Sequence, residues 1–196
     1  MVVDPQRMRM SVDEYLAYDR ASEVKHEYGD GEVIALAGGT IAHNDFTVNM
    51  VLLLREQLGR RGPCYAYASD LRVLVAKNHY FYPDVVVSCD IADRQEGSDI
   101  IRTPHLVVEV LSPSTEAKDR GYKLRCYQQC SSIQEYVLVN THVQRVDIYR
   151  RQAGGTWLYQ SYGAGQDVML DSLDIHFPMT ALYGGLRIPI EQSETG

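Results

Sequence analysis

A chain of 196 residues and 22.2 kDa is most economically one domain, because domains commonly have about 100–200 residues. Its hydrophobic fraction of 45% and charged fraction of 23% are ordinary for a globular protein and exclude a low-complexity chain. The net charge of -7 argues against a surface that binds polyanions everywhere, although a local basic patch can still meet phosphate.

The sequence predicts helices and strands in mixed order. Ser11 and Glu14 have the spacing of a capping box and open a first helix that ends near Asp19. A turn signal precedes an expected strand over 32–37, and apolar residues at helical spacing predict a long helix over 43–58. The remaining expected elements are strands at 64–68, 71–75, 83–88, 105–111, 135–140, 145–150 and 157–162, and a helix at 115–130 with Thr115 as its N-cap.

This order of elements predicts an α/β chain of the α+β type, with one mixed sheet and flanking helices. We expect a single domain over residues 1–190, including a C-terminal β-hairpin region built on the strands at 145–150 and 157–162. The polar residues 191–196 are expected to form a disordered tail.

Export and membrane signals are missing from the sequence pattern. The first residues lack the apolar core of a signal peptide, and no stretch has the roughly 20 apolar residues of a spanning helix. We therefore expect a cytoplasmic protein without membrane contact, in which Cys64, Cys89, Cys126 and Cys130 are reduced. Cys126 and Cys130 lie one helical turn apart, but without a nearby partner they are expected to be buried thiols rather than zinc ligands.

Glu109 is the most informative residue because it interrupts the apolar run 105–111. This run is rich in β-branched residues and ends at Ser112-Pro113, so it predicts a short buried strand. Alternation along the strand places Glu109 on one face with Val107 and Leu111. A carboxylate among such neighbours is costly unless a cation, a metal or hydrogen-bond donors meet it.

Asp84 is a second acid at the start of an apolar run, and it shares its strand face with Tyr82 and Val86. If the two strands are neighbours in register, the carboxylates of Asp84 and Glu109 converge. Two such charges about 4 Å apart repel by roughly 4 kcal/mol at an effective dielectric constant near 20. A divalent cation removes this penalty, and oxygen donors favour Mg²⁺ or Mn²⁺ over zinc. Such an ion can activate water and neutralise charge on a phosphodiester.

Nearby cations come from the helix that follows the Glu109 strand, which carries Lys118 and Lys123. Together with Arg120 and Arg125 these lysines could form a basic patch, and a solvated mixed-charge helix face is an equally good interpretation. Glu27, after the first helix, is a further acid that could point at the same place.

These residues resemble a known nuclease superfamily. Pro83-Asp84, with Glu109 25 residues further on, is similar to the PD-(D/E)XK superfamily, which has the restriction-endonuclease-like fold. The chain resembles most closely the Uma-two (Uma2) family of putative restriction endonucleases. The resemblance is carried by Tyr15-Leu16, His26-Glu27-Tyr28, Asp30-Gly31-Glu32, His43, Ser69-Asp70-Leu71-Arg72-Val73, Tyr82-Pro83-Asp84-Val85, Glu109-Val110-Leu111-Ser112-Pro113-Ser114-Thr115, Asp119-Arg120-Gly121-Tyr122-Lys123 and Glu135-Tyr136-Val137-Leu138-Val139.

One position departs from the superfamily pattern. Leu111 stands where a lysine is expected two residues after the acid, and Lys123 matches a lysine that has moved to the following helix. The resemblance therefore implies a catalytic site of Glu27, Asp84, Glu109 and Lys123. It also implies that Asp84, Glu109 and Glu27 bind the metal.

Structural roles are open for the same residues. Asp84 could hydrogen-bond local backbone amides at a strand start, and Lys123 could form an ordinary helix ion pair with Asp119, worth about 0.3–0.5 kcal/mol. Simple roles are also open for Glu27 in solvent, His43 at the helix start and Asp70 in a turn. Burial makes a purely structural role most expensive for Glu109.

The leading hypothesis is a Mg²⁺- or Mn²⁺-dependent deoxyribonuclease, an endonuclease that hydrolyses phosphodiester bonds in DNA. The alternative is a catalytically silent nuclease-like module that binds DNA or a protein, which Leu111 and the negative net charge favour. No nucleophile elbow or phosphate-binding glycine loop follows a strand, which argues against other hydrolases and nucleotide-binding proteins. A homodimer is expected, because two sites cut two strands most simply.

Overall fold

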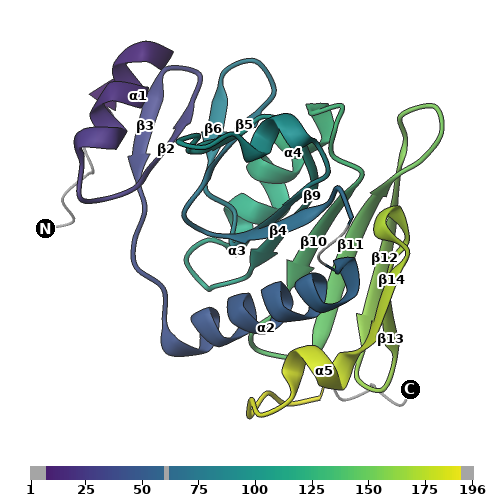
Figure 1. Ribbon diagram of the computed structural model, residues 1–196. Coiled ribbons are helices and arrows are strands. Elements are labelled where there is room, and N and C mark those ends of the chain that lie inside the picture. The colour runs from purple at the N-terminus through teal and green to yellow at the C-terminus, as the bar shows by residue number, and fades with distance from the viewer. Residues whose placement is uncertain (1–7, 60–61, 191–196) are drawn as a thin grey trace, which may run out of the picture.

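Two mixed sheets form the centre of the fold (Figure 1). A computed structural model describes residues 8–59 and 62–190, and the tail expected at 191–196 lies outside the described residues. Both sheets have six strands, in the orders β1-β3-β2-β6-β5-β8 and β12-β11-β10-β9-β7-β4, and a separate hairpin pairs β13 with β14. The expected α+β class is confirmed, with two sheets where one was expected.

The sheet that contains the Glu109 strand, β9, has the longer strands and is called the larger sheet. Every residue of β9 except His105 is buried, as is every residue of its neighbours β7 and β10. Both faces of this sheet are covered, which explains why these strands read as apolar runs rather than alternating patterns. Its strands are β4 (Tyr65–Ala68), β7 (Val85–Ser88), β9 (Pro104–Val110), β10 (Glu135–Val139), β11 (Arg145–Arg151) and β12 (Trp157–Gly163).

The second sheet lies beside the first and is covered by the N-terminal helix α1 (Val12–Ala21). The expected capping box is confirmed, because the Ser11 side chain accepts from the Glu14 amide while the Glu14 carboxylate accepts from the Ser11 amide. The strands of this sheet are β1 (Met8–Arg9), β2 (His26–Gly29), β3 (Glu32–Ala35), β5 (Arg72–Val75), β6 (His79–Phe81) and β8 (Ile100–Ile101).

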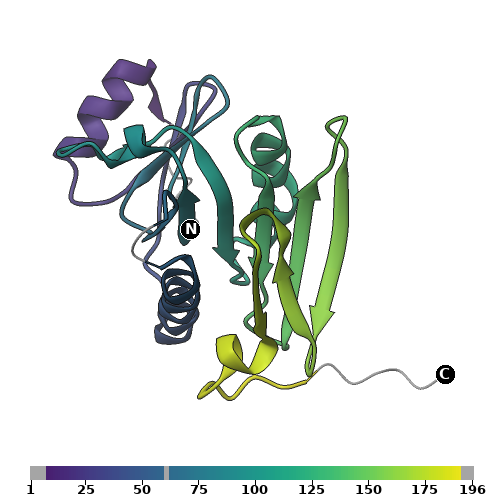
Figure 2. The ribbon, with the colours of Figure 1, turned by 45° about the vertical axis from the view of Figure 1, so that its right-hand side comes forward.

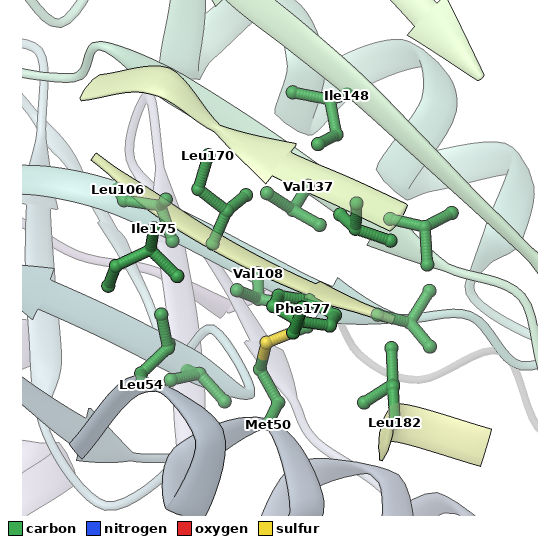
Figure 3. Close-up of a cluster of buried hydrophobic side chains, with 14 of the residues drawn as sticks. Met50, Leu54, Leu106, Val108, Val137, Ile148, Leu170, Ile175, Phe177 and Leu182 are labelled. Carbon is green, nitrogen blue, oxygen red and sulfur yellow. The ribbon is translucent and has the colours of Figure 1, made fainter. Parts of the chain in front are cut away.

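The long helix α2 (Ile41–Leu58) covers one face of the larger sheet. Figure 3 shows Met50 and Leu54 of this helix pointing towards side chains of the sheet, with Phe177 of the hairpin packed against them. The other elements on this side are β13 (Asp167–Leu170), the 3₁₀ turn η3 (Asp171–Leu173), β14 (Ile175–Pro178) and α5 (Met179–Tyr183). A further 3₁₀ turn, η1 (Ile91–Arg94), follows β7. None of the described helices is long and apolar enough to cross a membrane.

The opposite face of the larger sheet meets the tract expected as one helix over 115–130. This tract divides into α3 (Glu116–Lys118), the π-helical turn η2 (Asp119–Lys123) and α4 (Leu124–Gln129). It lies between the two sheets in Figure 2, and its buried side chains join those of both sheets in one cluster. Thr115 occupies the N-cap position but makes no capping hydrogen bond with its side chain.

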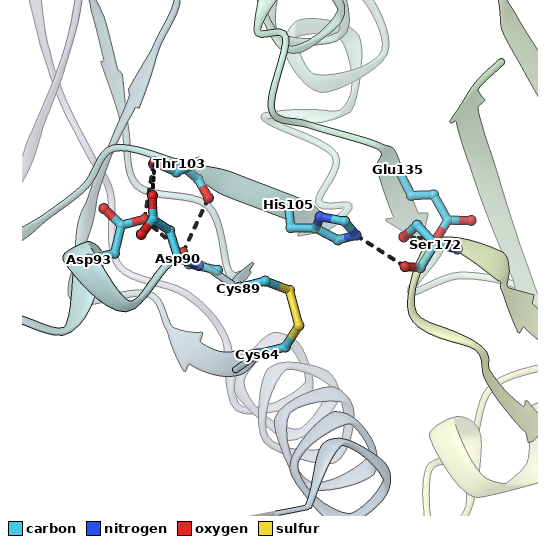
Figure 4. Close-up of a disulfide and its surroundings, with 9 residues drawn as sticks. Cys64, Cys89, Asp90, Asp93, Thr103, His105, Glu135 and Ser172 are labelled. Atoms are coloured by element: carbon cyan, nitrogen blue, oxygen red, sulfur yellow. Dashed lines mark hydrogen bonds between the residues drawn. A yellow bond between two sulfur atoms is a disulfide. The ribbon is translucent and has the colours of Figure 1, made fainter. Parts of the chain in front are cut away.

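The expectation of four reduced thiols is wrong for one pair. Cys64 and Cys89 form a disulfide, shown in Figure 4, while Cys126 and Cys130 are free and buried as expected. The physical reason is strand register: β4 pairs antiparallel with β7, and Tyr65 lies opposite Ser88. The next residue on each strand is a cysteine, so the two thiols meet across the sheet.

Candidate active site

Glu109 and Lys123 form the centre of a buried polar cluster. The Lys123 Nζ atom lies 2.8 Å from Glu109 Oε1, and the Tyr127 hydroxyl donates to the same oxygen at 2.8 Å. Only 5% of the Glu109 side chain and 7% of the Lys123 side chain are exposed. The cation that Glu109 requires in its apolar strand is therefore the lysine of the following helical tract.

Asp84 reaches the same end of the sheet from the neighbouring strand. The antiparallel register pairs Val85 with Val108, so Asp84 and Glu109 are the next residues along their strands. Asp84 Oδ2 accepts a hydrogen bond of 2.7 Å from the Val110 amide and lies 3.3 Å from His43 Nε2. The neighbouring strands expected from the sequence are confirmed. The amide from which Asp84 accepts belongs to the neighbouring strand, whereas the structural role considered for it required an amide at its own strand start.

Glu27 holds both lysines of the helical tract. Its Oε1 atom lies 2.8 Å from Lys123 Nζ, and its Oε2 atom lies 2.5 Å from Lys118 Nζ. Residues five apart in a regular α-helix differ by about 140° around the axis, so Lys118 and Lys123 would point in different directions. The π-helical turn, in which the Leu124 amide bonds to the Asp119 carbonyl, brings residues five apart into line.

Asp119 adds a fourth carboxylate that sequence reasoning treated only as a helix partner. Its side chain is 2% exposed, and Oδ1 lies 3.6 Å from Lys123 Nζ, beyond hydrogen-bond distance. This oxygen has no hydrogen-bond partner in the described structure. The sequence signal for Asp119 was its place at the start of the matched motif 119–123, directly after Lys118. The cluster thus contains a buried carboxylate oxygen that accepts no hydrogen bond.

Burial and charge shift the acids of the cluster in opposite directions. Desolvation raises the pKa of Glu109 well above its ordinary value, although Lys123 opposes the shift. Desolvation acts on Glu27 too, but Lys123 and Lys118 outweigh it and hold the pKa of Glu27 below its ordinary value. Burial would discharge Lys123, yet the carboxylates of Glu109, Glu27 and Asp119 together raise its pKa well above the ordinary value. The ammonium therefore stays charged.

The cluster is closed on the inside and open at one edge. Glu27 and Asp119 are 2% exposed in their side chains, whereas Asp84 is 15%, His43 is 23% and Lys118 is 29% exposed. The hydrogen bond to Asp84 raises the pKa of His43, against the opposing effect of its own burial. Solvent or a ligand would reach the cluster at the edge formed by these three residues.

The donor set suits a metal ion that needs few protein ligands. Across the described residues, no group of three or more His, Cys, Asp or Glu side chains is arranged to hold an ion. Mg²⁺ commonly uses only one or two carboxylates and keeps several waters, so Asp84 and Glu109 fit it. The Asp119 Oδ1 atom, which accepts no hydrogen bond in the described structure, is a further hard donor in the same cluster. Both oxygens of Glu27 already meet lysines, so its role as a metal ligand stays a prediction.

The structure brings together Glu27, Asp84, Glu109 and Lys123, as the sequence resemblance implied. Asp70 lies elsewhere, exposed and paired with Lys25 at 2.5 Å, which agrees with the turn considered for it. The four-residue basic patch does not form a free surface. Lys118 and Lys123 pair with carboxylates, and Arg120 Nη1 lies 2.8 Å from Oδ2 of the buried Asp147.

Comparison with protein families assigns this architecture. The profile of Uma2, described as a putative restriction endonuclease, matches residues 12–180. The chain belongs to the Uma2 family. Two relatives from Synechocystis sp. (strain ATCC 27184 / PCC 6803 / Kazusa) are similar: the uncharacterized protein slr1290, 38% identical over 91% of this chain and 93% of its own length, and the uncharacterized protein sll1609, 32% identical over 76% and 85%.

A solved structure shows the same fold for this Uma2 chain. A putative nuclease belonging to DUF820 from Anabaena variabilis ATCC 29413 superposes with a TM-score of 0.74, over 89% of this chain and 97% of that chain. The two sequences are 21% identical, so the likeness concerns the fold. The restriction-endonuclease-like nuclease fold expected from the sequence is thereby confirmed, in a family of putative nucleases.

Proposed function

We propose that this Uma2 protein is a Mg²⁺- or Mn²⁺-dependent endonuclease that hydrolyses phosphodiester bonds in DNA. The observation that carries the proposal is the convergence of Asp84 and Glu109, on neighbouring strands, with the ammonium of Lys123 held 2.8 Å from Glu109. Acids that are buried without a stability benefit are typical of functional sites. In the proposed assembly, a homodimer would present one such site to each DNA strand.

Each residue has a distinct part in the proposal. Asp84 and Glu109 would hold the cation, which supplies positive charge at the phosphodiester and favours attack by water at neutral pH. The Lys123 ammonium would stabilise the charge that develops on the phosphate oxygens. Glu27 positions Lys123 through its 2.8 Å contact. Water adds to phosphorus, the bond to one ester oxygen breaks, and that oxygen takes up a proton.

One observation favours the alternative of a silent binding module. Lys123 is paired with two carboxylates, Glu27 and Glu109, so the buried charges of the cluster are partly neutralised without any metal. Such a network could be kept for structure alone. The alternative predicts binding to DNA or to a protein without cleavage.

A plasmid-nicking assay with Mg²⁺ or Mn²⁺ tests the proposal, together with calorimetry of Mn²⁺ binding. We expect Asp84→Asn and Glu109→Gln to abolish both nicking and metal binding. We expect Lys123→Ala to slow nicking by about 10²–10³-fold while metal binding largely persists, because loss of one charge-stabilising donor typically has this cost. Lys118→Ala should have a smaller effect, since the only carboxylate its ammonium pairs with among the described residues is Glu27.

Lys77→Ala is the matched control, because this lysine is exposed in the turn between β5 and β6 and should leave nicking unchanged. Absence of nicking by the wild-type protein on supercoiled, linear and single-stranded DNA, combined with retained DNA binding, would establish the binding module instead. Equal Mn²⁺ binding by the wild type, Asp84→Asn and Glu109→Gln would remove the metal site from the proposal.

A further inference from the structure

Each of the two acids proposed to hold the cation has one oxygen that hydrogen-bond donors already occupy. Glu109 Oε1 accepts from Lys123 Nζ and from the Tyr127 hydroxyl, both at 2.8 Å. Asp84 Oδ2 accepts from the Val110 amide at 2.7 Å. Among the described residues, no hydrogen bond reaches the second oxygen of either carboxylate, Glu109 Oε2 or Asp84 Oδ1. The two acids therefore share one pattern, with one oxygen held and the other left without a donor.

Contact with solvent distinguishes these two oxygens from Asp119 Oδ1, which also accepts no hydrogen bond. Asp119 Oδ1 is fully buried in the described structure, whereas Glu109 Oε2 and Asp84 Oδ1 are not. A cation such as Mg²⁺, which keeps several of its waters and binds one or two carboxylates, requires oxygens of this kind. The donors on Glu109 Oε1 matter because they decide which oxygen of Glu109 stays available.

Tyr127 reaches Glu109 from α4, one helical turn after Lys123, so both donors come from the same face of the tract. Its fully buried ring packs against Phe81 and Tyr136, with ring centroids 5.6 Å and 4.7 Å away. This packing fixes the place of the hydroxyl. A phenol has an ordinary pKa near 10, and burial raises the pKa of Tyr127 further, so the hydroxyl is a donor at neutral pH.

Lys123 by itself does not fix the orientation of the Glu109 carboxylate. Its ammonium is shared with Glu27, whose Oε1 atom lies 2.8 Å away. An ammonium is a compact charge on a flexible stem, and the last torsion of a glutamate side chain is broad, so the pair alone allows the carboxylate to turn. The Tyr127 hydroxyl is a directional donor on a rigid ring. This second donor selects Oε1 and leaves Oε2 without a partner.

We propose that Tyr127 is a positioning residue of the cation site, whose hydroxyl holds Glu109 Oε1 and thereby keeps Oε2 available to the cation. The inference rests on the proposed function, because it requires that Glu109 binds Mg²⁺ or Mn²⁺. Tyr127 acts through Glu109 and contacts neither the cation nor the DNA. Groups that orient a metal ligand by a hydrogen bond typically contribute about 10–100-fold to metal affinity.

Calorimetry of Mn²⁺ binding by the full chain carrying Tyr127→Phe tests this role. Phenylalanine keeps the buried ring and loses only the donor. We expect the dissociation constant for Mn²⁺ to rise by about 10–100-fold. The Mn²⁺ concentration that gives half-maximal plasmid nicking should rise by the same factor, while the KM for the plasmid stays unchanged. A high Mn²⁺ concentration should accordingly restore nicking.

Tyr183→Phe is the matched control. The Tyr183 hydroxyl is also buried and donates to the Asn140 carbonyl at 2.6 Å, but α5 lies on the face of the larger sheet opposite the helical tract. This variant loses a buried hydrogen bond and should keep the wild-type affinity for Mn²⁺. Urea titration of both variants checks that the fold persists. A folded Tyr127→Phe that is less stable yet binds Mn²⁺ like the wild type would show a purely structural hydroxyl and overturn the proposal.

The role of Tyr127 and the proposed function fail in different ways. A wild-type protein that binds no Mn²⁺ overturns the cation site and the role of Tyr127 with it. A wild type that binds Mn²⁺ and nicks DNA, with equal binding by Tyr127→Phe, overturns the role of Tyr127 alone. Mn²⁺ binding without nicking by the wild type, weakened in Tyr127→Phe, supports the positioning role and overturns the nuclease.

Discussion

Two buried polar clusters lie on opposite sides of β2 and differ in how their charges are matched. His26 and Glu27 are consecutive residues, so their side chains point to opposite faces of the strand. His26 faces Asp19, whose carboxylate accepts from the His26 amide at 2.8 Å, from Arg72 Nε at 2.8 Å and from the Tyr82 hydroxyl at 2.5 Å. Both oxygens of the Asp19 carboxylate accept hydrogen bonds, and the buried Arg72 nitrogen without a hydrogen-bond partner in the described structure, Nη1, lies 2.9 Å from the Asp99 carboxylate.

The cluster around Glu27 lacks this balance. It gathers the carboxylates of Glu27, Asp84, Glu109 and Asp119 around the two ammonium groups of Lys118 and Lys123. The pKa values of Glu109 and Asp119 are raised, and one Asp119 oxygen accepts no hydrogen bond in the described structure, although it lies 3.6 Å from Lys123 Nζ.

This is the difference expected between a cluster kept for structure and the proposed active site. A network kept for stability approaches complete hydrogen bonding, because a half-satisfied buried network destabilises the fold. We expect the surplus of carboxylates around Glu27 to destabilise the isolated protein and to become favourable with an added cation. Removal of one acid from each cluster tests this difference.

The largest expected effect is the loss of Asp19. Asp19→Ala leaves the buried Arg72 guanidinium and the Tyr82 hydroxyl without their shared acceptor, which should lower the free energy of unfolding by about 3–5 kcal/mol. Asp119→Ala is the counterpart in the other cluster and should be close to neutral, since it removes a surplus charge. Urea titration of both variants measures the contrast. Equal destabilisation by the two variants would contradict the division into balanced and unbalanced clusters.

A smaller effect is expected at Gly29, where β2 passes beneath the π-helical turn. A Cβ atom at this position would collide with the Tyr122 hydroxyl and lie 3.0 Å from His79 Cδ2. Gly29→Ala should destabilise the protein by about 1–3 kcal/mol through overpacking, and addition of Tyr122→Phe should recover part of the loss. Gly38→Ala is the control, because a Cβ there meets nothing within 4 Å. Failure of Tyr122→Phe to rescue stability would show that the turn does not constrain β2.

The smallest expected effect is a pH-dependent gain from Glu109→Gln. A raised pKa means that the folded state keeps a proton that the unfolded state releases, so wild-type stability falls as pH rises from about 4.5 through the folded pKa. Glutamine cannot ionise and escapes this loss. The variant should match the wild type at low pH and become the more stable of the two as the pH rises above about 4.5.

Urea titrations at several pH values measure this difference. Glu14→Gln gives the opposite sign, because the hydrogen bonds from Ser11 lower the pKa of Glu14 and its stabilisation is present only above its unfolded pKa. A Glu109→Gln variant that is several kcal/mol less stable at pH 8 would instead show that the ion pair with Lys123 stabilises the fold.

Local patterns in the sequence were sufficient for most elements of the larger sheet. The apolar runs of β7, β9 and β10 and the spacing of α2 identified their type and bounds to within two residues. The hairpin of β13 and β14 was missed, although alternate burial of Val168 and Leu170, and of Ile175 and Phe177, is a period-2 signal that was available. The short strand β2 was missed because it lacks an apolar run. Its polar residues His26 and Glu27 are buried by the two clusters on either side of the strand.

The amino-acid sequence alone shows which acids are costly to bury and which family the chain resembles. Both follow from residue type and immediate neighbours: a carboxylate inside an apolar strand is costly wherever that strand packs. Which cations and hydrogen-bond donors contact those acids follows only from the tertiary structure. The register of β7 against β9, the pairing of Cys64 with Cys89 and the π-helical turn that aims Lys118 and Lys123 at Glu27 each join residues distant in sequence or depend on one extra residue in a turn. No short-range periodicity records these contacts, because they depend on packing between elements.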